Sequence, residues 1–86
     1  MTKPQLYIVE CDYRPNNPNK PRYPVWATSV KEARDYIPTH YTYLKFYSIR
    51  LPTEDELKRY MEDAYSVRLY THNYEKYNKE LREMLR

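Results

Sequence analysis

The sequence predicts a small α+β domain, with a three-stranded sheet built in the order strand–strand–helix–strand and a long or broken C-terminal helix. The chain has 86 residues, a length that suits one domain, so we assign residues 1–86 to a single unit. Strand-like alternation dominates the first half, and helix-like spacing of apolar residues dominates the end. Hydrophobic residues make up 41% of the chain, which excludes a disordered protein.

The first two predicted strands lie near the N-terminus. Residues 5–12 (QLYIVECD) carry apolar side chains on both faces, which is typical of a central strand or one covered on both sides. Residues 23–28 (YPVWAT) form the second strand, and consecutive strands favour a hairpin. Cys11, the only cysteine, is expected to be a small buried apolar side chain. Because no internal disulfide can form, we expect a reducing compartment, the cytoplasm.

The connection between these strands is YRPNNPNKPRYP (13–24), with a proline at every third position from residue 15. The chain has no glycine, so the asparagines of this segment are best able to adopt left-handed backbone conformations. Prolines also lower the entropy of the unfolded chain. These features favour a stiff structural loop. Two alternatives are a polyproline II docking peptide and a loop tip that presents Arg14, Lys20 and Arg22 to an acidic partner.

A short helix and the third strand follow. A helix is predicted over residues 30–37, because Ser29 and Glu32 have the spacing of a capping box. Pro38 is expected to end this helix. Residues 41–52 (YTYLKFYSIRLP) are rich in aromatic and β-branched side chains and predict a strand.

The C-terminal segment predicts helix from Thr53, which forms a second capping box with Glu56. Apolar residues recur at helical spacing in two stripes, Leu57, Met61, Ala64 and Tyr65, then Val67, Tyr70, Tyr74, Tyr77, Leu81 and Met84. One helix over 54–85 would be about 48 Å long, which exceeds a compact domain of this size. We therefore expect a break near 70–73, with Asn73 capping the next helix. The alternative is a projecting helix that pairs with a second subunit.

The sequence contains no recognisable catalytic or metal-binding motif. His40 and His72 are far apart and lack the spacing of metal ligands, so each is expected to be a solvated side chain. The absence of glycine excludes glycine-rich phosphate-binding loops. We expect no enzyme activity, no cofactor and no metal. No apolar run approaches the roughly 20 residues that span a bilayer, so no membrane association is expected.

Charge is unevenly distributed along the chain. Residues 1–52 hold eight Lys or Arg against four Asp or Glu, whereas residues 53–86 hold seven against eight. The sheet half is therefore the basic side. Aromatic and basic side chains in this half could stack on bases and contact phosphates, namely Tyr13, Tyr23, Trp26, Lys31 and Arg34. A nucleic-acid-binding regulator is accordingly the alternative function.

Tyrosine is unusually abundant, with twelve in the chain, and tyrosine is enriched at protein interfaces. Together with the proline-stiffened loop, this composition predicts a protein that binds a partner protein through its surface alone. The expected contact residues are Tyr13, Arg14, Lys20, Arg22 and Tyr23. A third alternative is a self-assembling structural protein, for example a homodimer, joined through a face formed by Tyr70, Tyr74 and Tyr77.

The segments QLYIVECD, YPVWATSVKEARDYI and YLKFYSIRLP, within residues 5–52, resemble the strand–strand–helix–strand units of small phage-encoded inhibitor proteins. Anti-CRISPR and other host-takeover proteins are of this kind. The resemblance implies a non-catalytic protein that occupies the surface of a bacterial defence or host enzyme, in the host cytoplasm. It carries over no functional residue.

Overall fold

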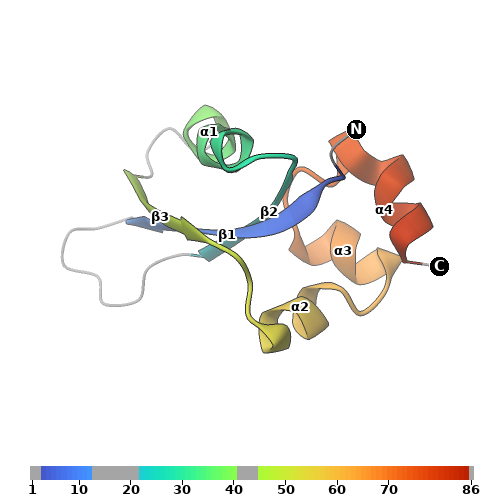
Figure 1. Ribbon diagram of the computed structural model, residues 1–86. Helices are drawn as coiled ribbons and strands as arrows, with labels where there is room; N and C mark the ends of the chain where they lie inside the picture. Colours follow the sequence, from blue (N-terminus) through green and yellow to red (C-terminus); the bar gives the residue numbers. More distant parts are fainter. Residues whose placement is uncertain (1–2, 13–21, 41–44, 86) are drawn as a thin grey trace.

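The computed structural model describes residues 3–12, 22–40 and 45–85. Their helices and strands, in chain order, are β1 (Gln5–Asp12), β2 (Arg22–Ala27), α1 (Val30–His40), β3 (Lys45–Arg50), α2 (Glu54–Tyr60), α3 (Ala64–Tyr70), the 3₁₀ turn η1 (Glu75–Tyr77) and α4 (Asn78–Met84). Figure 1 shows α1 above the sheet, α2 and α3 below it, and α4 at one end. The predicted α+β class and its strand–strand–helix–strand order are confirmed.

The sheet is antiparallel throughout, in the order β2-β1-β3, so β1 is the central strand, one of the two arrangements that its sequence predicted. Leu6 pairs with Trp26, and Val9 pairs with Tyr23 on one side and Ile49 on the other. The pairing of β1 with β2 confirms the predicted hairpin. Successive side chains of β1 point to opposite faces of the sheet. Because both sets are apolar, each face must be buried against other elements of the fold.

The core is divided between the two faces of the sheet. Side chains of one face pack against α1 in a first cluster, formed by Tyr7, Val9, Cys11, Val25, Ala27, Ala33 and Ile37. The other face meets the C-terminal helices in a second cluster, formed by Leu6, Trp26, Val67, Tyr77 and Leu81. Cys11 is fully buried, as expected, and burial raises the pKa of its thiol. Since both faces are covered, β1 is apolar on both sides.

The predicted end of the first helix is wrong, because α1 continues past Pro38 to His40. A proline in the last turn removes only one backbone donor. The next two side chains also bind carbonyl oxygens of that turn: the Thr39 hydroxyl donates to Asp35 at 2.8 Å, and His40 Nδ1 lies 2.9 Å from Tyr36 O. The third strand also ends two residues earlier than predicted. It ends at Arg50, and residues 41–44 lie outside the described ranges.

The C-terminal segment is broken twice. The break near residues 70–73 is confirmed, whereas the break at residues 61–63 was not predicted. Asp63 creates it by capping α3, since its carboxylate accepts a hydrogen bond from the Ser66 N–H at 2.7 Å. The break also overturns the first predicted apolar stripe, three members of which are exposed: Leu57, Ala64 and Tyr65. The capping box of Thr53 and Glu56 is confirmed.

Residues Thr71–Asn73 lie along the free edge of β2 and hold the C-terminal helices to the sheet. His72 forms a parallel bridge with Val25, in which Trp26 N donates to His72 O at 3.0 Å and His72 N donates to Pro24 O at 2.7 Å. The Thr71 hydroxyl accepts from Trp26 Nε1 at 2.9 Å and donates to a carbonyl of α3. This short segment therefore sets the position of α3 relative to η1 and α4.

Asn73 was expected to cap a helix, but its role is different. Its backbone adopts the left-handed region, with φ of 64°, and its side-chain amide donates to Trp26 O at 2.9 Å. Asparagine tolerates this conformation better than most residues. Asn73 thus turns the chain away from the sheet edge, and η1 and α4 begin without a side-chain cap.

Candidate binding site

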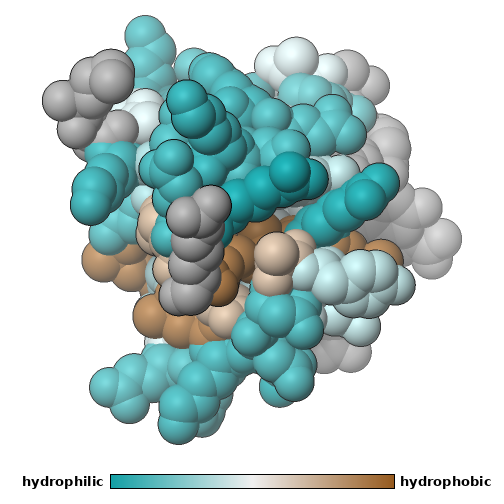
Figure 2. Space-filling view, turned by 90° about the vertical axis from the view of Figure 1, so that its right-hand side faces the viewer, coloured by the Kyte–Doolittle hydropathy of each residue, from teal (hydrophilic) through white to brown (hydrophobic). Residues whose placement is uncertain are grey.

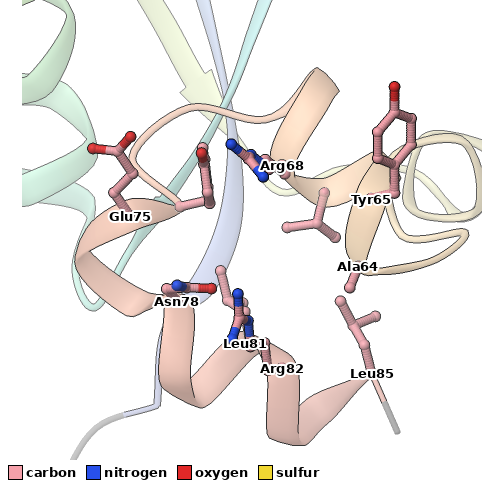
Figure 3. Close-up of a pocket in the computed structure, with 10 residues that line it drawn as sticks. Ala64, Tyr65, Arg68, Glu75, Asn78, Leu81, Arg82 and Leu85 are labelled. Atoms are coloured by element: carbon pink, nitrogen blue, oxygen red, sulfur yellow. The ribbon is translucent and has the colours of Figure 1, made fainter.

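A groove lies between α3 on one side and η1 and α4 on the other, with a volume of about 420 Å³. Its lining residues are Ala64, Tyr65, Val67, Arg68, Tyr74, Glu75, Asn78, Leu81, Arg82 and Leu85 (Figure 3). Six of the ten are exposed, so this is an open groove and not an enclosed cavity. In size it falls near the lower end of ordinary ligand pockets, roughly 300–1,000 Å³.

The floor of the groove is part of the second core cluster. Val67 and Leu81 are each only 2% exposed and pack towards Trp26. Tyr74 and Leu85 are half-buried against the same cluster. A floor built from well-packed core side chains is held in place before any partner arrives. The groove is therefore preformed, which lowers the entropic cost of binding.

Two arginines occupy opposite walls of the groove. Arg68 comes from α3 and Arg82 from α4; Glu75 lies at one end, and Tyr65 and Leu85 lie at the other (Figure 3). Within the described ranges, neither arginine forms an ion pair. Both guanidinium groups are therefore free of a carboxylate from the described part of the chain.

Some basic side chains elsewhere form ion pairs with carboxylates instead. Arg50 lies 3.1 Å from Glu10 and 2.7 Å from Glu56, and it joins β1, β3 and α2. The bond from Arg50 holds the pKa of the Glu56 carboxyl at about 2 despite partial burial. Lys76 lies 2.5 Å from Glu32. The contrast distinguishes the groove arginines from cations that stabilise the fold.

Exposed apolar side chains are frequent on the helices that form the groove, and one of them, Tyr65, lines it. Seven large hydrophobic residues are exposed among those described, and four of them lie on α3 or α4: Tyr65, Leu69, Tyr70 and Met84. Figure 2, which faces the right-hand side of Figure 1, shows apolar surface between hydrophilic regions on this side of the molecule. Grouped apolar surface with a polar rim is typical of an interaction site.

A second hollow, of about 330 Å³, brings both histidines together beside the Thr71–Asn73 segment. His40 is exposed, as expected, and stacks on Tyr36 with ring centroids 3.9 Å apart. The expectation of a solvated side chain is wrong for His72, which is half-buried. Its ring centroid lies 5.3 Å from the ring centroid of Tyr23. Burial lowers the pKa of His72, and the charge of His40 lowers it further. No group of three metal ligands occurs in the described part of the chain.

Glu32 is an interaction centre that the sequence did not reveal. Its N–H donates to Ser29 Oγ at 3.2 Å, but its carboxylate turns away from Ser29 and accepts from Thr28 N at 2.7 Å. Only half of the predicted capping box therefore forms. The same carboxylate accepts from Lys76 Nζ and from the Tyr77 hydroxyl, each at 2.5 Å. Burial raises the pKa of Glu32, but these hydrogen bonds outweigh it and hold the pKa at about 2.

Of the five predicted contact residues, Tyr13, Arg14 and Lys20 lie outside the described ranges. Arg22 is exposed and lies 3.9 Å from Glu10. Tyr23 is half-buried against the first core cluster. The structure does not bring Arg22 and Tyr23 to the groove, so these two residues and the groove belong to separate candidate contact regions.

The predicted tyrosine face does not form one exposed surface. Tyr70 is 54% exposed, Tyr74 lines the groove, and Tyr77 is 8% exposed with its hydroxyl on Glu32. Trp26 is 1% exposed and its indole N–H is bonded to Thr71, so it cannot stack on a base. The nucleic-acid interpretation therefore loses one of its expected aromatic contacts.

Fold and site together define a small α+β domain that carries an open, preformed groove with an apolar floor and two arginines on its walls. Comparison of the chain with protein-family models, curated proteins and solved structures finds no match. In the described ranges, no helix has both the length and the apolar character needed to cross a membrane.

Proposed function

We propose that this protein is a non-catalytic binding module that acts by steric occupancy of a partner protein, and that the groove between α3 and α4 is its main contact site. The observation that carries the proposal is the groove itself, an apolar depression flanked by two arginines without carboxylate partners in the described ranges. Binding energy at protein interfaces is concentrated where a few anchors enter such depressions, and arginine and tyrosine are frequent there.

The chemistry of the groove supports binding more than catalysis. Its lining side chains, all within the described ranges, include no serine, threonine, cysteine or histidine. They supply apolar contact, two guanidinium groups, one carboxylate and one amide. These groups can hold and orient a partner, and they offer none of the usual combinations of nucleophile and base.

The biological form that we propose is inhibition of a bacterial defence or host enzyme, which the resemblance to small phage-encoded inhibitors suggests. Steric occupancy requires a rigid surface, and the groove floor belongs to the core. A second contact region remains proposed, formed by Tyr13, Arg14 and Lys20 together with Arg22 and Tyr23 of β2.

The proposal is tested by filling the groove. Ala64 is an exposed lining residue in the first turn of α3, so Ala64→Trp should place a large ring in the groove without disturbing the core. The matched control is Lys58→Trp, which adds the same ring at an exposed position of α2. Each protein is immobilised and used for affinity capture from a bacterial host extract.

We expect a partner that is retained by the wild type and by Lys58→Trp to be lost with Ala64→Trp. Circular dichroism should show the same helical content for all three proteins. If Ala64→Trp retains every protein that the wild type retains, the groove is not the contact site.

A further inference from the structure

Resting on the proposed function, we infer that the groove selects an acidic peptide segment of its partner. An apolar side chain of that segment inserts at the Ala64–Leu85 end, and a neighbouring carboxylate lies between Arg68 and Arg82.

The apolar end of the groove determines where the anchor lies. Ala64 contributes only a methyl group, and the Leu85 side chain extends towards it from the end of α4 (Figure 3). Val67 and Leu81 form the floor beneath. A leucine-sized side chain placed here would replace water over apolar surface, which is favourable.

The arginines determine the charge of the occupant. Arg68 and Arg82 approach the groove from two different helices, so one carboxylate between them can accept hydrogen bonds from both. Guanidinium groups suit this role because their planar donors match the geometry of a carboxylate. Beside an apolar floor such bonds are less screened by water than on an open surface. A basic segment would meet uncompensated repulsion at the same place.

Glu75 makes the two ends of the groove different in charge, so a bound segment has a preferred orientation. It lines the groove at the end opposite Leu85 (Figure 3), so the lining is negative at one end, positive in the middle and apolar at the other. A carboxylate of the occupant is repelled from the Glu75 end and attracted to the middle. The anchor at the Ala64–Leu85 end and the acid in the middle are therefore close to each other along the bound segment.

The experiment uses the full chain and three fluorescein-labelled synthetic peptides. The first has twelve residues with two leucines one helical turn apart, each flanked by glutamates. The second has lysine in place of every glutamate, and the third has serine in place of both leucines. Binding is measured by fluorescence anisotropy at two salt concentrations, because exposed charge contacts weaken with salt.

The groove arginines are tested by the double variant Arg68→Gln/Arg82→Gln. The matched control is Lys58→Gln/Lys79→Gln, which removes the same charge from exposed positions that do not line the groove. We expect the wild type and the control to bind the glutamate peptide at least about tenfold more tightly than the lysine peptide. The Arg68→Gln/Arg82→Gln variant should lose that preference, and the serine peptide should bind weakly to every protein.

Equal binding of the glutamate and lysine peptides, or a preference that survives in Arg68→Gln/Arg82→Gln, would overturn the inference. Absence of binding by either peptide would overturn it as well, while the capture experiment with Ala64→Trp decides the proposed function independently. Displacement of the glutamate peptide by a short oligothymidylate at lower concentration than by unlabelled peptide would identify a phosphate site instead. Self-association of the wild type that Ala64→Trp abolishes would identify a second copy of the chain as the occupant.

Discussion

Replacement of Trp26 by alanine is expected to destabilise the protein by about 3–5 kcal/mol, the usual cost of removing a buried tryptophan. Trp26 is 1% exposed and contacts the C-terminal helices in the second core cluster. Its indole N–H is bonded to Thr71, which would lose that donor. Since small domains have a total stability of only about 5–15 kcal/mol, this loss removes a large share of it.

The loss should be largest in the helices after β3, because the first core cluster does not include Trp26. Urea denaturation followed by circular dichroism measures the change. The control is Tyr65→Ala, which removes an aromatic ring that is 69% exposed and should change stability by less than about 0.5 kcal/mol. Equal stability of Trp26→Ala and the wild type would mean that Trp26 does not hold the C-terminal helices to the sheet.

Glu32→Gln is expected to remove stability in a pH-dependent way. Hydrogen bonds from Lys76, Tyr77 and Thr28 hold the pKa of Glu32 at about 2, below its ordinary value of 4.5, although burial acts in the opposite direction. The folded protein therefore binds this proton less readily than the unfolded chain. The stabilisation is complete above pH 4.5 and is lost as the pH falls towards 2. Near neutral pH it should amount to about 2 kcal/mol, because solvent screens part of the interaction.

The measurement is the free energy of unfolding of the wild type and Glu32→Gln at pH 7, 4 and 2.5. The difference between them should be greatest at pH 7 and should shrink as the pH falls. Glu56, whose pKa is also about 2, contributes to both proteins and cancels in this comparison. Glu83→Gln, an exposed position on α4, provides the control and should follow the wild type at every pH. A pH-independent difference for Glu32→Gln would contradict the assignment.

The strands and their order along the chain could be predicted because the information is local. Residues 5–12 are apolar on both faces, and only a strand covered on both sides needs that pattern. Thr53 and Glu56 form their capping box within four residues of chain. The end of α1 was predicted too early, at Pro38. The rule that proline ends a helix applies less strictly in the last turn.

The groove could not be predicted from the sequence, because its walls depend on contacts between distant residues. Helical spacing continues through Asp63, so the two stripes suggested one long helix up to the break near residue 70. The side chain of Asp63 instead begins a new helix, which changes the faces that Ala64 and Tyr65 present. Asp63 is itself a favoured capping residue, and this was the available signal.

The side-chain interactions that hold the helices in place could not be predicted from the sequence either. Glu32 is separated by more than forty residues from Lys76 and Tyr77. Trp26 is likewise far in sequence from Thr71. Such pairs follow from the packing of the second core cluster and leave no pattern in the local sequence.

The central claim is that the groove between α3 and α4 binds a partner protein. Site-specific crosslinking tests this claim most directly. Benzoylphenylalanine is introduced in place of Tyr65, which lines the groove, and in a second protein in place of Lys58 on α2. After irradiation in host extract, the Tyr65 position should give a discrete crosslinked product that disappears when Arg68→Glu is added, and the Lys58 position should give none. The same product from both positions, or one from Lys58 alone, would contradict the claim.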